Sequence, residues 1–189
     1  MTYAKMSVSL LIEAQSHAQM TTDNTPDALL SFQPINLDQD SDICVRFFKD
    51  MLLCAFGSAC QLDEPNGAQP YLESLREKAA AIPGSIVHVL DETHVVGQIE
   101  MSVLKTEPVV GYIHFFYLIP EWRSRGAGKL LLAYATRFLA GLGCERMRLS
   151  VSETNQRAAQ FYSHHGWTDI GPRQDKPELR LRLMERSIG

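Results

Sequence analysis

The chain has 189 residues, of which 45% are hydrophobic and 21% are charged. These proportions are typical of a globular protein, and the length suffices for one domain with a sizeable core. The formal net charge of −4 argues against nucleic acid as a partner, because nucleic-acid-binding proteins usually carry a basic surplus. No apolar run approaches the roughly 20 residues of a membrane span, so we expect no membrane association.

The cysteines and the N-terminus set two further expectations. The four cysteines form no Cys-x-x-Cys pair and have no histidine at metal-binding spacing, so we expect reduced thiols, no metal and a cytoplasmic location. Residues 1–30 lack a signal-peptide pattern, and a short helix is expected over Val8–Ala18. We expect this segment to be an N-terminal extension and residues 31–189 to form a single domain.

The first elements after this extension are a strand and two helices. The helix signals are acidic residues at Asp38–Asp42 before an apolar stretch that stops at Gly57, and later a stop at Pro83-Gly84. The predicted segments are Phe32–Leu37 (strand), Ile43–Phe56 (helix) and Tyr71–Ile82 (helix).

The hydrophobic period then changes to that of strands. Ser85–Leu90 and Val95–Leu104 are predicted strands, and Val95–Leu104 places Glu100 on a polar face that we expect to be solvated. Pro108 breaks the run. Gly111–Ile119 is apolar on both faces, which predicts a central strand covered on both sides. Short turns between the three strands indicate an antiparallel meander.

The C-terminal third alternates helices and strands. The predicted elements are Ala127–Ala140 (helix), Arg146–Val151 (strand), Gln156–His165 (helix, capped by Asn155) and Leu179–Leu183 (strand). A helix as long as Ala127–Ala140 allows a right-handed crossover, so the strands on either side of it should lie parallel. The prediction is an α/β fold with a mixed sheet.

The junction between Gly111–Ile119 and the next helix reads Pro-Glu-Trp-Arg-Ser-Arg-Gly-Ala-Gly-Lys over residues 120–129. Glycines let the backbone approach a ligand, and N–H groups at a helix start favour phosphate. A dinucleotide fingerprint would need a third glycine and a later acidic residue, and a P-loop would need Ser or Thr after Gly128-Lys129. Neither is present. A glycine-rich turn with solvated arginines is the simpler alternative.

A second motif favours the phosphate interpretation. Asn-x-x-Ala-x-x-Phe-Tyr-x-x-x-Gly-Trp covers residues 155–167, one strand after Arg-x-x-Gly-x-Gly at 123–128. Together, in this order, the two motifs resemble the GNAT superfamily of acyl-CoA-dependent N-acetyltransferases. The resemblance covers residues 85–183 well and the earlier helices weakly. It implies the GNAT fold: a mixed, mostly antiparallel sheet with a splayed parallel pair, flanked by helices.

The resemblance also implies acetyl-CoA as cosubstrate, with no metal. The corner formed by Arg123, Ser124, Arg125, Gly126, Ala127, Gly128 and Lys129 would hold the pyrophosphate. The backbone of Phe116, Tyr117 and Leu118 would pair with the pantetheine arm, and one N–H there would receive the oxyanion. Asn155, with Ala158 in the same motif, would contact the pantetheine or a bound water.

Tyr162 matches the general acid of the family. A phenol, with a pKa of about 10, stays protonated at neutral pH and can protonate a departing thiolate, whose pKa is near 8.5. Core packing beside Phe161 is the alternative. Two candidates for the general base are Glu100, otherwise a solvated carboxylate, and His114, otherwise a hydrogen-bonded core histidine.

The expected reaction is direct attack of a primary amine on acetyl-CoA in a ternary complex. The acceptor would be a small-molecule or peptide amine, and homodimers are common in such proteins. A CoA-binding module with a regulatory or interaction role and no turnover is the alternative from another functional class.

Overall fold

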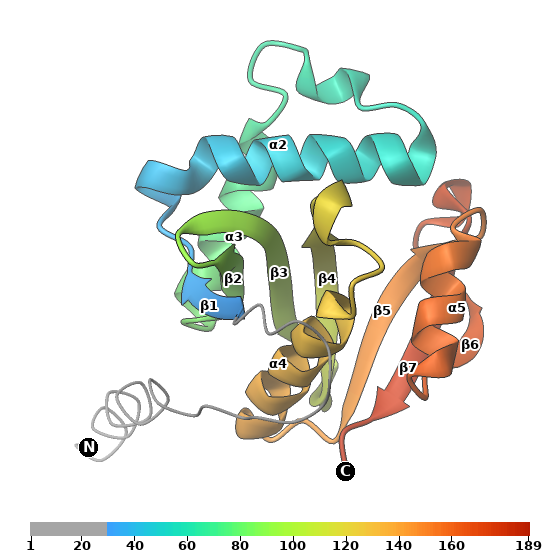
Figure 1. Ribbon diagram of the computed structural model, residues 1–189. Coiled ribbons are helices and arrows are strands. Elements are labelled where there is room, and N and C mark those ends of the chain that lie inside the picture. The colour runs from blue at the N-terminus through green and yellow to red at the C-terminus, as the bar shows by residue number, and fades with distance from the viewer. Residues whose placement is uncertain (1–29) are drawn as a thin grey trace.

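The computed structural model describes residues 30–189, so the expected helix over Val8–Ala18 lies outside the described residues. One seven-stranded sheet runs through the molecule in the order β1-β2-β3-β4-β5-β7-β6. Helices α2 and α3 cover one face of its N-terminal half, and α4 and α5 lie on the other side of the molecule (Figure 1). The mixed α/β architecture expected from the sequence is confirmed.

The N-terminal elements are β1 (Leu30–Pro34), α2 (Leu37–Phe56) and α3 (Gln69–Ala81). Helix α2 begins earlier than predicted because Asn36 caps it: the Asn36 side chain accepts a hydrogen bond from the Asp38 N–H at 3.1 Å. Its predicted end is confirmed, since Gly57 takes the left-handed conformation with φ of 73°.

The antiparallel meander consists of β2 (Ile86–Asp91), β3 (His94–Leu104) and β4 (Glu107–Leu118). Strand β4 is the fourth of the seven in the sheet, as its two apolar faces predicted. Pro108 lies within β4, near its start, and does not end a strand. The polar face of β3 is not solvated as expected: Gln98 is 0% exposed and Glu100 only 2%, since α2 and α3 pack over this face.

The remaining elements are α4 (Ala127–Gly141), β5 (Arg146–Ser152), α5 (Gln156–His164), β6 (Thr168–Pro172) and β7 (Leu181–Ser187). Short 3₁₀ turns occupy Cys60–Leu62, Pro120–Trp122 and Pro177–Leu179. Strands β4 and β5 are parallel, as the intervening helix predicted, and β5 pairs antiparallel with β7. Strand β7 begins two residues later than the predicted Leu179–Leu183 strand and extends to Ser187.

The main core lies between the sheet and α4. Leu131, Ala135 and Leu139 of α4 are fully buried against β2, β3 and β4. Gly111 of β4 permits this approach, because a Cβ there would lie 2.6 Å from a Leu139 methyl group. Along the described part of the chain, the helices lack the combination of length and hydropathy needed to cross a membrane.

Candidate active site

Strands β4 and β5 separate halfway along their length. Their pairing runs only from Val110↔Arg146 to Ile113↔Leu149, although β4 continues to Leu118 and β5 to Ser152. The two strands diverge toward α2 (Figure 1). A cavity of about 260 Å³ lies at this split, lined by Met51, Tyr112, Ile113, His114, Phe115, Phe116, Leu149, Ser150, Val151, Ser152, Asn155, Ala158, Tyr162, Arg173 and Leu181.

A β-bulge shapes the β4 wall of this cavity. Glu100 of β3 pairs with Phe115, but the next residue, Met101, pairs with Ile113, so His114 is the extra residue. Bulges often occur beside active sites, where they redirect side chains and backbone groups. Beyond Ile113, the β4 edge toward β5 has no strand partner among residues 30–189, so its backbone groups are free to bind a ligand.

The corner between β4 and α4 contains two residues with positive φ, Ser124 at 62° and Gly126 at 81°. Among residues 30–189, the backbone N–H groups of Arg125, Gly126, Ala127 and Gly128 have no hydrogen-bond partner. These groups open a 15-residue helix whose dipole favours an anion at this end. The predicted phosphate corner therefore has the unpaired donors that it needs.

Arg123 is already engaged in contacts within the protein. Its Nε donates to the Leu118 carbonyl at 2.7 Å, and its Nη2 donates to Asp50 Oδ2 of α2 at 2.9 Å. The hydroxyl of Tyr117 also donates to Asp50, and this hydrogen bond and the Arg123 pairing lower the pKa of Asp50. Arg123 thus joins α2 to the end of β4.

The other polar side chains of the corner differ from Arg123 in their surroundings. Arg125 and Lys129 are exposed, and no ion pair involves either within the described residues. The Ser124 hydroxyl accepts a hydrogen bond from Arg157 of α5 at 2.6 Å. The exposed cations Arg125 and Lys129 are therefore the side chains that remain available to an anion at this corner.

Helix α5 brings its motif to the cavity. Asn155 caps the helix as predicted, with Oδ1 accepting from the Ala158 N–H at 3.0 Å, and both residues line the cavity. Tyr162 is 7% exposed, and its ring packs edge-on against Phe116, Phe161 and Trp167. Burial raises the pKa of Tyr162, so the phenol stays protonated. Its hydroxyl has no hydrogen-bond partner among residues 30–189.

The two candidate bases lie in different surroundings. His114 lines the cavity, with Nε2 2.7 Å from the Ser102 hydroxyl. The His114 side chain is exposed, not part of the core, yet desolvation by the cavity wall, with the charges of Lys78 and Arg173, lowers its pKa below the usual 6.5, so its imidazole is neutral at pH 7. Glu100 is not among the cavity residues, and its carboxylate accepts hydrogen bonds from Tyr71, Lys78 and Gln98.

Of the remaining predicted site residues, Phe116 lines the cavity, whereas the Tyr117 and Leu118 side chains do not. Sequence reasoning missed Tyr112, Ser150 and Arg173 on the cavity wall. The alternation of β4 could have placed Tyr112 beside His114. Arg173 follows β6 in an irregular segment, where no periodicity marks it.

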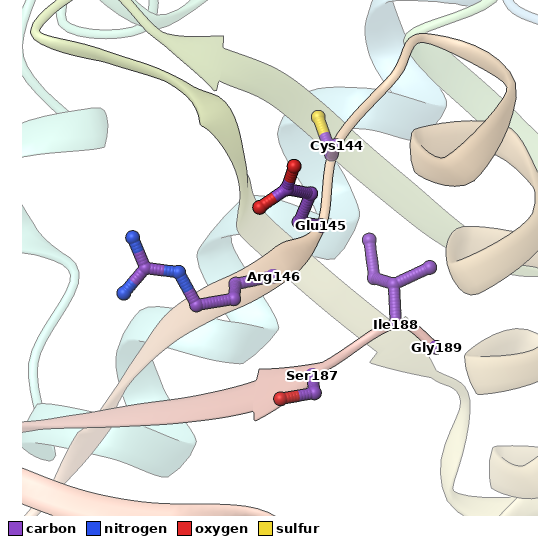
Figure 2. Close-up of a pocket in the computed structure, with 6 residues that line it drawn as sticks. All are labelled: Cys144, Glu145, Arg146, Ser187, Ile188 and Gly189. Atoms are coloured by element: carbon purple, nitrogen blue, oxygen red, sulfur yellow. The ribbon is translucent and has the colours of Figure 1, made fainter.

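A second hollow, of about 510 Å³, lies at the opposite end of β5 (Figure 2). It is lined by the residues around the start of β5 and the end of β7, among them Cys144, Arg146 and Ile188. Burial raises the pKa of the Cys144 thiol, which makes it a poor nucleophile. The cavity at the β4–β5 split, with its tyrosine and histidine, is therefore the better candidate site.

Comparisons with known proteins agree with this geometry. Residues 45–167 match the model of the "Acetyltransferase (GNAT) family". Thialysine N-epsilon-acetyltransferase of Bos taurus is 30% identical over 59 residues, which is 31% of this chain. The chain spans about a third (35%) of the length of that relative.

Solved structures share the fold. PaiA N-acetyltransferase from Thermoplasma acidophilum, in complex with coenzyme A, has a TM-score of 0.67 and 16% identity, covering 84% of this chain and 98% of its own. A GNAT-family acetyltransferase from Staphylococcus aureus Mu50 has a TM-score of 0.66 and 17% identity, covering 85% and 99%.

The family match extends from α2 to the end of α5 and includes both sequence motifs, the corner before α4 and the cavity wall on α5. The matched residues include the splayed parallel pair β4–β5, and the fold resembles that of the solved acetyltransferases. This chain therefore belongs to the GNAT family of acetyltransferases.

Proposed function

We propose that this enzyme transfers the acetyl group of acetyl-CoA to the nitrogen of a primary amine, by direct attack in a ternary complex. The observation that carries the proposal is the split between β4 and β5, with the unpartnered Tyr162 hydroxyl on its wall. The cavity has residues from α5 on one side and Met51 of α2 on the other, so two ligands can meet at the split.

The CoA pyrophosphate would bind the free N–H groups of Arg125–Gly128, with Arg125 and Lys129 adding positive charge. Arg123 would not contact the pyrophosphate but would position the corner, because it joins α2 to the end of β4. The pantetheine arm would follow the unpaired edge of β4 near Phe116 toward Asn155 and Ala158. The coenzyme A bound to the PaiA structure supports this class of cosubstrate.

The chain supplies two groups for the chemistry. A backbone N–H on the free β4 edge would donate to the oxyanion of the tetrahedral intermediate, a contribution of about 3–4 kcal/mol in other acyl-transfer enzymes. As the carbon–nitrogen bond forms and the carbon–sulfur bond breaks, Tyr162 would donate its proton to the departing CoA sulfur, whose free pKa is near 8.5. The proton that the amine nitrogen loses would return to the Tyr162 oxygen through water in the cavity. The raised pKa of Tyr162 keeps its own proton available at neutral pH.

His114 is the proposed contact for the attacking amine. Its neutral imidazole would accept a hydrogen bond from the amine N–H. Glu100 would have a structural role, because it accepts a hydrogen bond from Lys78 of α3. A histidine of such low pKa removes protons weakly. An amine with a pKa near 7.8 reaches its neutral form at pH 7 for about 1 kcal/mol, against about 4.6 kcal/mol for one near 10.4.

Replacing Tyr162 by Phe tests the proposal. We expect Y162F to lower kcat about 100-fold or more, because the leaving thiolate loses its acid, while the Kd for acetyl-CoA changes less than about twofold. The measurements are calorimetry with acetyl-CoA and thiol release over a panel of amines. Y134F is the matched control, since Tyr134 is a partly buried tyrosine of α4 stacked on Phe32, away from the cavity.

Two results would count against the proposal. An unchanged kcat in Y162F would remove Tyr162 as the acid. Wild-type protein that binds no acetyl-CoA and releases no thiol with any amine would contradict the function as a whole. Acetyl-CoA binding without amine-dependent release would favour the alternative of a binding module.

A further inference from the structure

We infer that Arg173 makes this enzyme selective for amine acceptors that also carry a carboxylate, such as free amino acids. The inference rests on the proposed function and names the chemical class of its acceptor. Arg173 follows β6 and lines the cavity on the same wall as Tyr112 and Ser150.

The charge of the cavity supports an anionic group on the acceptor. Among its lining residues in the described chain, Arg173 is the one permanent charge, and none is an aspartate or glutamate. Lys78 also acts on His114 electrostatically, and its own partner Glu100 lies outside the lining. The Asp175 carboxylate that pairs with Arg173 lies outside the lining. Within the lining a polycationic acceptor would meet no carboxylate, whereas an acceptor carboxylate would be complementary to the side of Arg173 that Asp175 leaves open.

The hydrogen bonds of Arg173 leave one of its nitrogens weakly engaged. Asp175 accepts from Nε at 2.7 Å and from Nη2 at 2.9 Å, which fixes the plane of the guanidinium. The remaining nitrogen, Nη1, has only long contacts, 3.4 Å to the Tyr112 hydroxyl and 3.5 Å to the Ser150 hydroxyl. Contacts of this length are weak, so the Nη1 donors remain available to a ligand that lies in the guanidinium plane.

Nη1 and one hydroxyl proton therefore converge on one place, since one of the two neighbouring hydroxyls donates to the other. The Tyr112 and Ser150 hydroxyls lie 2.6 Å apart, and Arg173 packs over the Tyr112 ring at 5.9 Å. A carboxylate has two oxygens and can accept from Nη1 and from a hydroxyl together. Its binding would replace two long contacts with charge-assisted hydrogen bonds.

This place is next to the proposed amine contact. The rings of Tyr112 and His114 are 4.8 Å apart on the cavity wall. The amine and carboxylate of one small molecule could therefore reach His114 and Arg173 at the same time. Such two-point binding would orient the nitrogen toward the split between β4 and β5.

The test pairs each of several amino acids, L-lysine included, with its primary amide, and measures kcat/KM by thiol release. Wild type should prefer the acids by about 10- to 100-fold. Amidation lowers the pKa of the neighbouring amine, so a larger fraction of that amine is neutral at pH 7. Without a carboxylate contact, the amides would therefore be the better acceptors. R173Q should lower kcat/KM for the acids by a similar factor, mainly through KM, and leave the amides within about threefold.

R182Q is the matched control. Arg182 makes the same side-on pair with an aspartate, Asp169, at 2.9 Å for both nitrogens, but it does not line the cavity. R182Q should keep the wild-type preference. Calorimetry with acetyl-CoA on each variant checks that the cosubstrate site is intact.

The outcomes separate the inference from the proposed function. Equal use of acids and amides by the wild type, or an equal loss for both in R173Q, would overturn the role of Arg173 while leaving the acetyltransferase intact. Absence of acetyl-CoA binding and of thiol release would contradict the proposed function. In that case calorimetric titration of the amino acids and their amides into the protein still tests the carboxylate site, and equal binding of both would overturn it.

Discussion

Glu100 is a charged residue in the interior, with 2% of its side chain exposed. Lys78 Nζ donates to it at 2.9 Å, the Tyr71 hydroxyl at 2.8 Å and Gln98 Nε2 at 3.1 Å. A buried carboxylate is tolerated when its oxygens are paired in this way, and it becomes costly when a partner is removed. Tyr71 and Lys78 tie α3 to β3 at Glu100, which lies next to the register shift that creates the His114 bulge.

At this residue scale we predict that K78M lowers the free energy of unfolding by about 3–5 kcal/mol, because it leaves Glu100 uncompensated. The double variant K78M/E100Q should recover part of that loss. Chemical denaturation of K78M, E100Q and K78M/E100Q gives the coupling energy between the two residues.

K49M is the control for the lysine substitution. Lys49 pairs with Asp63 at the surface, where 43% and 63% of the two side chains are exposed. Its removal should change the free energy of unfolding by less than about 1 kcal/mol. Equal losses in K78M and K49M would contradict the structural role given to Glu100.

Among the helices, the contact between α4 and α5 places the corner motif of residues 123–128 beside the α5 motif of residues 155–167. Gly128, in the first turn of α4, faces the ring of Phe161, and a Cβ at this position would lie 2.8 Å from the ring. Gly128 therefore has two roles: it lets α4 pack closely against Phe161, and it supplies one of the free N–H groups of the corner. The position of α4 relative to α5 sets the distance from the phosphate corner to Tyr162.

We predict that G128A destabilises the protein by about 1–3 kcal/mol and weakens acetyl-CoA binding, because Phe161 or the start of α4 must move. Thermal or chemical unfolding measures the first effect, and calorimetry the second. G141A is the control within the same helix, since a Cβ there meets nothing within 4 Å. A G128A variant that matches G141A in both measurements would contradict this account.

The sequence predicts those elements best whose signals are local. The αL glycine at Gly57, the Asn155 cap and the apolar run of β4 each specify a boundary or a position from neighbouring residues. The burial of Glu100 and the pairing of Arg123 with Asp50 depend on where α2 and α3 pack, and no local pattern encodes that packing. The corner between β4 and α4 was thus predictable from the sequence, whereas the pairing of Arg123 with Asp50 was not.

The stability of the whole molecule should depend on pH through its histidines. Burial lowers the pKa of His88, which is 4% exposed, below its usual 6.5, and His114 shifts in the same direction. The unfolded chain then binds more protons than the folded one just below pH 6.5. Stability is therefore fully present above pH 6.5 and falls as the pH decreases toward the folded pKa values.

We predict that the free energy of unfolding declines between pH 7 and pH 5, and that H88Q makes this decline shallower. Denaturant titrations at several pH values measure the slope. The control is H94Q, because His94 is exposed at the start of β3. A slope that is the same in H88Q, H94Q and wild type would show that His88 does not contribute.

The central claim is that the free N–H groups of the α4 corner and the β4–β5 split hold one acetyl-CoA-like ligand. A crystal structure with coenzyme A tests it most directly. We predict that the diphosphate accepts hydrogen bonds from the N–H groups of Arg125–Gly128, and that the sulfur lies beside the Tyr162 hydroxyl. A ligand bound elsewhere, with this corner empty, would contradict the account.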